Sequence, residues 1–237
     1  AHYAEAYPNW GEGPKLYVAL RLLWNPQQDV DQVLRDWYVR AVGPQAADDL
    51  AAYYAHWEDF WTRRILQSKW FSKQGQYLAF YNASYLADAT DEEIARSRRL
   101  LEQVAAKAAT AKQKARAALL LRAFEYYEAS ACAYPRPGNP NDQVVRSEAD
   151  ALRVLEDGER SLQMIRKRRQ LVDEFAKHPV LVHPLGLQDL PQLAGDDWGV
   201  NRLWLAFDWV RKSDLLRARV GQLAASPLEP VSTQAKT

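Results

Sequence analysis

The sequence has a single cysteine, Cys132, and four histidines among its 237 residues. One cysteine excludes an intrachain disulfide and a cysteine-based metal site. The histidines do not occur at the spacing of a metal-binding motif; they are His2, His56, His178 and His183. The sequence also has no glycine-rich phosphate loop and no nucleophile-elbow motif. We therefore expect neither a metal ion nor a cofactor.

Two further features are missing: an excess of one charge and a long apolar run. The 31 basic residues nearly balance the 30 acidic ones, so composition gives no reason to expect a nucleic-acid partner. No run of about 18 apolar residues occurs, and the sequence therefore predicts no membrane span. The chain does not begin with Met, and no signal-peptide pattern follows Ala1.

Most of the sequence has the pattern of amphipathic helices. Apolar residues recur at steps of three and four, and proline, glycine and N-capping residues separate the segments. A small, polar, proline-containing tail, residues 226–237, is predicted to be disordered. A loop and a helix are expected between 70 and 86 and a loop from 180 to 195. The predicted helices are 14–24, 29–43, 44–69, 90–133, 142–177 and 197–225.

Particular residues support several of these helices. Asp29 with Gln32 and Thr90 with Glu93 have the spacing of a capping box. The two long helices flank a break rich in proline at 134–140, which favours an antiparallel hairpin. Helix 14–24 has one apolar face, made by Leu16, Ala19, Leu20 and Leu23. Helix 44–69 has an aromatic stripe expected to face inward, made by Leu50, Tyr53, Tyr54, Trp57, Phe60 and Trp61. Helix 90–133 has a heptad seam, made by Ile94, Leu101, Val104, Ala108, Ala111, Ala115 and Ala118.

The first dozen residues differ from the rest of the chain. Alternation places Glu5 and Tyr7 on one face of a short strand, and Asn9 and Trp10 follow in a polar, aromatic turn before the first helix. Strand, loop and helix form the repeating unit of an α/β barrel, whose active sites lie in the loops after the strands. A carboxylate accepts hydrogen bonds from sugar hydroxyls and an indole stacks on a sugar ring. The segment is therefore either a sugar-binding edge or an edge strand capped by a packed Trp.

Other charged clusters offer less. Adjacent carboxylates at 48–49, 58–59, 92–93 and 196–197 point in different directions on a helix, so none forms the opposed pair that a glycosidase needs. The basic runs 96–99 and 166–169 are interpreted as solvated helix surface, and Cys132 as an inert helix residue.

Residues 3–11 read YAEAYPNWG and residues 16–26 read LYVALRLLWNP. This block, with the continuation at 29–38 and 43–47, resembles the bacterial domain of unknown function 4838, and the resemblance is specific through about residue 70. That family looks like a glycoside-hydrolase barrel related in style to α-glucuronidases and β-hexosaminidases. The resemblance implies that Glu5 and Trp10 line a sugar pocket, that Arg21 and Trp24 join the last barrel helix to a helical region, and that the protein is extracellular or periplasmic.

The expected fold is mainly α, with an N-terminal strand remnant of a (β/α)8 barrel followed by a helical bundle with a long antiparallel hairpin. Residues 1–26 are expected to be the last βα unit, 27–225 the C-terminal helical domain and 226–237 the tail. The expected function is that of the C-terminal part of a glycoside-hydrolase-like protein whose catalytic acid lies outside this chain. Its expected partners are a glycan, bound through Glu5, Tyr7, Asn9 and Trp10, and the upstream barrel segment. The alternative is a stand-alone helical interaction module that uses the hairpin as its partner surface.

Overall fold

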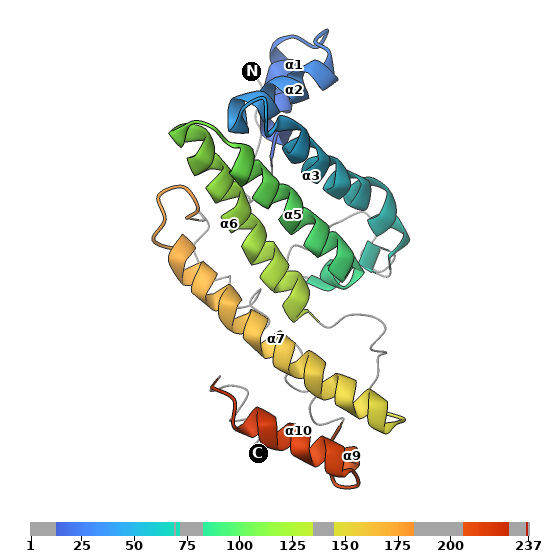
Figure 1. Cartoon of the computed structure of the whole chain (residues 1–237). Coiled ribbons are helices and arrows are strands. Elements are labelled where there is room, and N and C mark those ends of the chain that lie inside the picture. The colour runs from blue at the N-terminus through green and yellow to red at the C-terminus, as the bar shows by residue number, and fades with distance from the viewer. Residues whose placement is uncertain are drawn as a thin grey trace. The chain divides into compact units, whose positions relative to one another are not determined.

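The computed structural model describes residues 13–68, 70–71, 83–134, 145–182, 206–227 and 236 (Figure 1). Every regular element in these ranges is a helix, and none of these residues lies in a strand. The chain divides into two compact units, which are described separately. Unit 1 comprises 1–78, 90–127 and 175–186; unit 2 comprises 79–89, 128–174 and 187–237.

Unit 1 begins with three helices, of which the first two follow the predicted boundaries to within one residue. The carboxylate of Asp29 caps α2 by accepting hydrogen bonds from the backbone N–H groups of Asp31 (2.9 Å) and Gln32 (3.3 Å). The reciprocal half of the expected capping box is absent, because the Gln32 amide donates to Asp36 Oδ1 (2.9 Å) instead. The three helices are α1 (Lys15–Trp24), α2 (Val30–Val42) and α3 (Ala47–Asp59).

The predicted helix 44–69 is α-helical only as far as Asp59. It continues as a π-helix, η1 (Phe60–Arg64), and a 3₁₀ turn, η2 (Ile65–Gln67). Leu50, Tyr53, Trp57 and Phe60 are buried as predicted. Trp61 is exposed, because the wider π turn rotates the residues after Phe60 away from the expected stripe.

The prediction of one continuous helix from 90 to 133 was wrong. The segment forms α5 (Asp91–Lys107) and α6 (Ala111–Ala133), separated by residues 108–110. A second capping box begins α6: Thr110 N donates to Gln113 Oε1 (3.0 Å), and Gln113 N donates to Thr110 Oγ1 (3.2 Å). The heptad seam ends at the break. Ile94, Leu101, Val104 and Ala108 are buried, whereas Ala111, Ala115 and Ala118 are exposed.

The core of unit 1 lies between α3, α5 and α6, which run side by side (Figure 1). The ion pair between Lys107 Nζ and Asp49 Oδ2 (2.6 Å) joins the end of α5 to the start of α3, so these helices are antiparallel. Aromatic rings connect α3 to α6: the centroids of Tyr53 and Phe124 are 5.9 Å apart.

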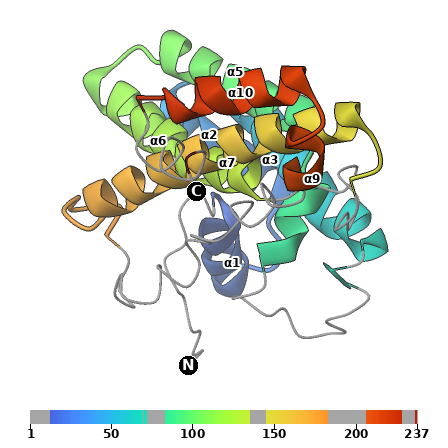
Figure 2. The same ribbon diagram turned by 90° about the horizontal axis from the view of Figure 1, so that it is seen from below.

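Unit 2 contains most of α7 (Glu148–Phe175), with η3 (Ala83–Asp88), α9 (Phe207–Val210) and α10 (Asp214–Ala224). The prediction of one helix over 197–225 was wrong, since the chain breaks at 211–213 and Ser213 caps α10. α7 and α10 lie side by side (Figure 2). Their shared core consists of Ala151, Val154, Leu155, Leu162, Ala206, Leu216 and Leu223.

The last turns of α6 contact the middle of α7 within unit 2. Ser161 Oγ donates to the carbonyl oxygen of Ala133 (2.6 Å), and Lys167 Nζ lies 3.4 Å from Glu128 Oε2. Residue numbers increase along α7 as they decrease along α6, so the two helices are antiparallel over this stretch. The connection 135–144 lies outside the described residues, and the complete hairpin stays a prediction.

Candidate functional site

The residues predicted to bind sugar lie outside the described part of the chain. Glu5, Tyr7, Asn9 and Trp10 all fall within residues 1–12, and so does the predicted strand. The described structure begins at Gly13, at the end of the predicted loop and directly before α1. It therefore shows how the end of this loop is held.

Gly13 lies against the ring of Tyr54, a residue of α3. Its φ angle is 73°, in the left-handed region that glycine adopts readily and that residues with a Cβ atom disfavour. A Cβ atom at position 13 would lie 2.2 Å from Tyr54 Cε1 and 2.5 Å from Cζ, both inside van der Waals contact. Backbone conformation and close packing therefore both require glycine here.

Tyr54 is in turn held by an aromatic cluster from α2 and α3. Its ring stacks on Tyr38, with centroids 6.1 Å apart, and meets the edges of Trp37 (5.7 Å) and Tyr53 (5.1 Å). Burial, with smaller contributions from Tyr53 and Tyr38, raises the pKa of the Tyr54 phenol far above its ordinary value, so the ring stays neutral. Gly13 is thus packed on an aromatic cluster of α2 and α3.

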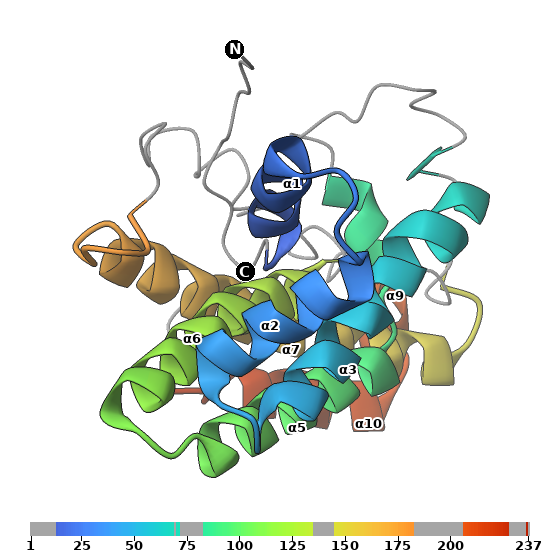
Figure 3. The ribbon, with the colours of Figure 1, turned by 90° about the horizontal axis from the view of Figure 1, so that it is seen from above.

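Helix α1 contacts α2 (Figure 3), and its half-buried side carries Tyr17, Val18, Arg21 and Leu22. Arg21 Nε donates to Gln28 Oε1 (2.9 Å), and Gln28 Nε2 donates to the carbonyl oxygen of Arg21 (2.7 Å). Arg21 also donates to Tyr17 Oη (3.4 Å). These bonds tie α1 to the turn before α2, as the resemblance implied for Arg21. Trp24 makes no such junction, because its side chain is 91% exposed.

The apolar face predicted for α1 points outward. No residue of α1 is buried. Leu16, Leu20 and Leu23 are 45%, 58% and 52% exposed, and Trp24 adjoins them at the C-terminal end. The term "α1 face" is used below for these four residues.

A family comparison covers this same region of the chain. Residues 1–55 match the family model of DUF4838, a domain of unknown function. The resemblance seen in the sequence is thereby confirmed over these residues. No curated protein and no solved structure matches the chain.

The DUF4838 match contains both members of the Gly13–Tyr54 contact and all of the α1 face. The sequence had placed Tyr54 on a core stripe and had not singled out Gly13. The dipeptide Gly13-Pro14 is typical of a turn, which was the available signal. The partner of Gly13 could not be read from the sequence, because Tyr54 is distant along the chain.

Outside the DUF4838 match, Glu93 connects three segments of unit 1. Its Oε2 accepts hydrogen bonds from the backbone N and the Oγ1 of Thr90, both at 2.9 Å, which completes the predicted capping box. Its Oε1 forms an ion pair with Arg64 of η1 and lies 3.8 Å from Nε2 of His56. With these partners, Glu93 is a structural residue rather than a general acid.

The surroundings of His56, which lies near Glu93, shift its pKa. Burial lowers the pKa of His56, the charges of Arg96 and Arg64 lower it further, and Asp59 opposes them. The imidazole is therefore held neutral. The described residues contain no group of three or more side chains that could hold a metal ion.

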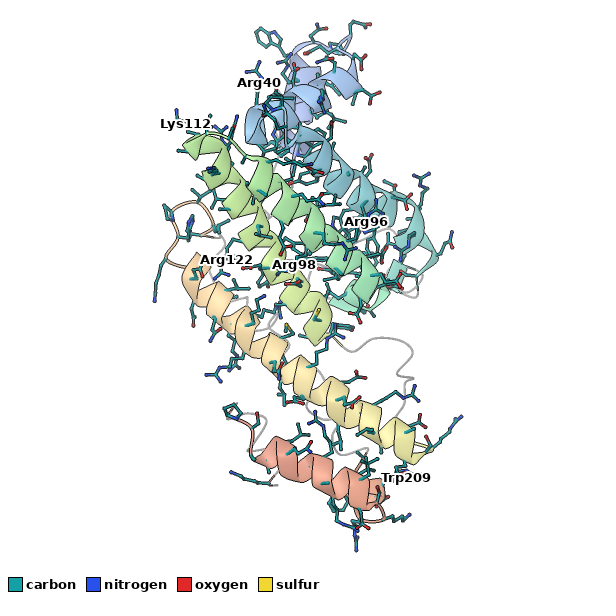
Figure 4. All side chains as sticks on the ribbon, in the orientation of Figure 1. Arg40, Arg96, Arg98, Lys112, Arg122 and Trp209 are labelled. Carbon is teal, nitrogen blue, oxygen red and sulfur yellow. The ribbon has the colours of Figure 1, made fainter. Side chains whose placement is uncertain are left out.

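The basic run of α5 is compensated by neighbouring carboxylates. Arg98 and Arg122 reach Glu125 from α5 and α6 (Figure 4), and Arg98 also lies 3.4 Å from Glu102. Asp48 pairs with Arg35. These pairs support the interpretation of the charged clusters as helix surface. None of the described helices has the length and apolarity needed to cross a lipid bilayer.

Proposed function

We propose that this chain is the C-terminal part of a carbohydrate-active, glycoside-hydrolase-like protein. In this proposal residues 1–26 form the last strand, loop and helix of a barrel, and the helices that follow brace it. The family match over residues 1–55 supports the placement of this unit, but the family itself is one of unknown function. The assignment to sugars rests on the side chains of the loop and on the resemblance to glycoside-hydrolase barrels.

The observation that carries the proposal is the anchoring of Gly13 on Tyr54. Binding sites need loops whose ends are fixed by well-packed residues. Trp10 precedes Gly13 by only three positions, so α3 limits where the loop can go.

Each loop residue has a role in this proposal. Glu5 and Asn9 form hydrogen bonds with sugar hydroxyl groups, while Tyr7 and Trp10 offer aromatic rings to the apolar face of a pyranose. The catalytic acid comes from an earlier strand outside this chain, and no residue of the chain is assigned a catalytic role.

The test begins with the gene. The reading frame should extend upstream by a barrel's worth of sequence, roughly 200 residues or more. The whole encoded protein is then titrated with oligosaccharides that contain glucuronic acid or N-acetylhexosamine. Trp10→Ala should weaken binding by about fivefold or more, since one stacking contact on an aromatic ring contributes about 1–3 kcal/mol. Trp61→Ala removes an exposed indole that lies outside both the loop and α1, and it should leave binding unchanged.

Unchanged affinity in Trp10→Ala would remove the pocket role. A reading frame that opens near Ala1 would favour the alternative, a stand-alone interaction module. That alternative expects exposed apolar residues along the long helices. Among the described residues of α5, α6 and α7, no large apolar side chain is exposed, so no observation favours it.

A further inference from the structure

The apolar stripe of α1 formed by Leu16, Leu20 and Leu23 is exposed, unlike that of an ordinary surface helix. A surface helix normally buries its apolar stripe and exposes its polar one. In α1 the half-buried side carries Tyr17, Val18, Arg21 and Leu22, and the α1 face points outward. The bonds between Arg21 and Gln28 fix this orientation, because turning the helix inward would break them.

We propose that the α1 face is covered by the apolar outer face of a β-sheet in the same protein, namely the strands of the barrel. This inference rests on the proposed function for the identity of the sheet. In a barrel each helix follows its strand and loop and packs its apolar side on the strands. α1 follows the predicted strand and loop directly, so it occupies the position of such a helix.

The chemistry of the α1 face fits this partner. It consists of Leu16, Leu20, Leu23 and Trp24, with Ala19 beside them, and it carries no charge. The strands of a parallel α/β sheet are covered on both faces and are rich in branched apolar residues. A partner that bound through charged groups would find no complement here.

A second copy of the chain fits less well, because the face is small. α1 has ten residues and is about 15 Å long, and its face supplies four side chains, whereas a stable interface takes roughly 20–30 residues from each partner. A stable protein–protein interface buries roughly 800 Å² on each partner. Packing within one chain needs no such area, because the connection already holds the two surfaces together.

Cysteine labelling in the whole encoded protein tests this proposal. Leu20→Cys is made in a Cys132→Ser background, and the matched control is Leu215→Cys on α10. The two leucines are 58% and 55% exposed, so without a covering sheet both positions should react equally with a maleimide. We expect position 20 to react at least about tenfold more slowly than position 215.

Equal rates at the two positions would overturn the proposal. Protection at position 20 that disappears on dilution would also overturn it, since this would identify a second copy as the cover. As a second measurement, Leu20→Glu should lower the melting temperature by several degrees, whereas Leu215→Glu should not. An unchanged melting temperature in Leu20→Glu would contradict docking.

The same protein distinguishes this proposal from the proposed function. If position 20 is protected but no glycan binds, the sugar assignment fails and the docking surface stands. If glycans bind through Trp10 but position 20 reacts freely, the docking surface fails and the sugar assignment stands.

Discussion

The ring of Tyr54 occupies the space that a side chain at Gly13 would fill, 2.2 Å from the position of its Cβ atom. Gly13→Ala would combine a disfavoured positive φ with this overlap. We expect it to lower the free energy of unfolding by roughly 2 kcal/mol or more. Urea denaturation followed by tryptophan fluorescence measures the change.

Two variants serve as controls for Gly13→Ala. Gly221 lies in α10 with nothing within 4 Å of its hypothetical Cβ, so Gly221→Ala should stabilise the protein by up to about 1 kcal/mol. In a Tyr54→Ala background, Gly13→Ala should cost less than in the native protein, because the overlap is gone. Equal effects of Gly13→Ala in both backgrounds would show that the ring does not limit position 13.

A second prediction concerns the break between α5 and α6. Thr110→Ala removes the hydroxyl that accepts from Gln113 N, and should cost about 1 kcal/mol of stability. Thr110→Ser keeps the hydroxyl and should behave as the native protein. The same pair of substitutions at Thr90 gives the comparison for the capping box of α5. If Thr110→Ala were neutral while Thr90→Ala was destabilising, the cap of α6 would not contribute.

This break also shows what the sequence could predict. The spacing of Thr110 and Gln113 is that of a capping box, so a helix start could have been predicted there. The alanine-rich heptad pattern, however, passes through this point without a proline or glycine. The three residues 108–110 reset the helical phase, so Ala117 is buried and Ala118 is not. Local hydrogen bonding settled the boundary where periodicity alone predicted continuity.

Other features depended on contacts between distant residues. The helix starts at Asp29 and Thr90 were predicted because a capping side chain and its backbone partners are close in sequence. The π-helix after Asp59 has no comparable local signal. The sequence predicted the apolar face of α1, but not that it faces outward, because that depends on Gln28 holding Arg21. The sugar-binding role of the loop stays a prediction.

The third prediction concerns pH. Since the folded protein holds the pKa of His56 below 6.5, the unfolded chain binds a proton at this residue more readily. The contribution to stability is complete above about pH 6.5 and is lost as the pH falls through the unfolded value towards the lowered folded one. Glu93 does not reverse this, because Arg64 and Thr90 already engage its carboxylate.

His56→Gln should flatten the pH dependence in this range. The measurement is the free energy of unfolding at pH 7.5, 6.5 and 5.5 in the native protein and the variant. His178→Gln is the control. It leaves His56 in place, so the pH dependence of the native protein should persist in this variant. An unchanged slope in His56→Gln would assign the acid sensitivity to other groups.

The last prediction concerns the start of α10 in unit 2. Ser213 Oγ accepts a hydrogen bond from Leu216 N (3.2 Å) and donates to Glu148 Oε1 at the start of α7. Beside it, Trp209 Nε1 donates to the carbonyl oxygen of Val145 (3.0 Å; Figure 4). Ser213 is therefore both an N-cap and a link between two helices.

Substitutions separate these two roles of Ser213. Ser213→Ala removes both bonds and should cost about 1–2 kcal/mol. Ser213→Asp keeps the cap but places a second carboxylate against Glu148, so it should also destabilise near neutral pH. Adding Glu148→Gln should restore stability to Ser213→Asp, because the amide can donate to the new carboxylate. Thermal unfolding of the three variants measures this, and a Ser213→Asp protein that Glu148→Gln does not rescue would show that the link to α7 contributes little.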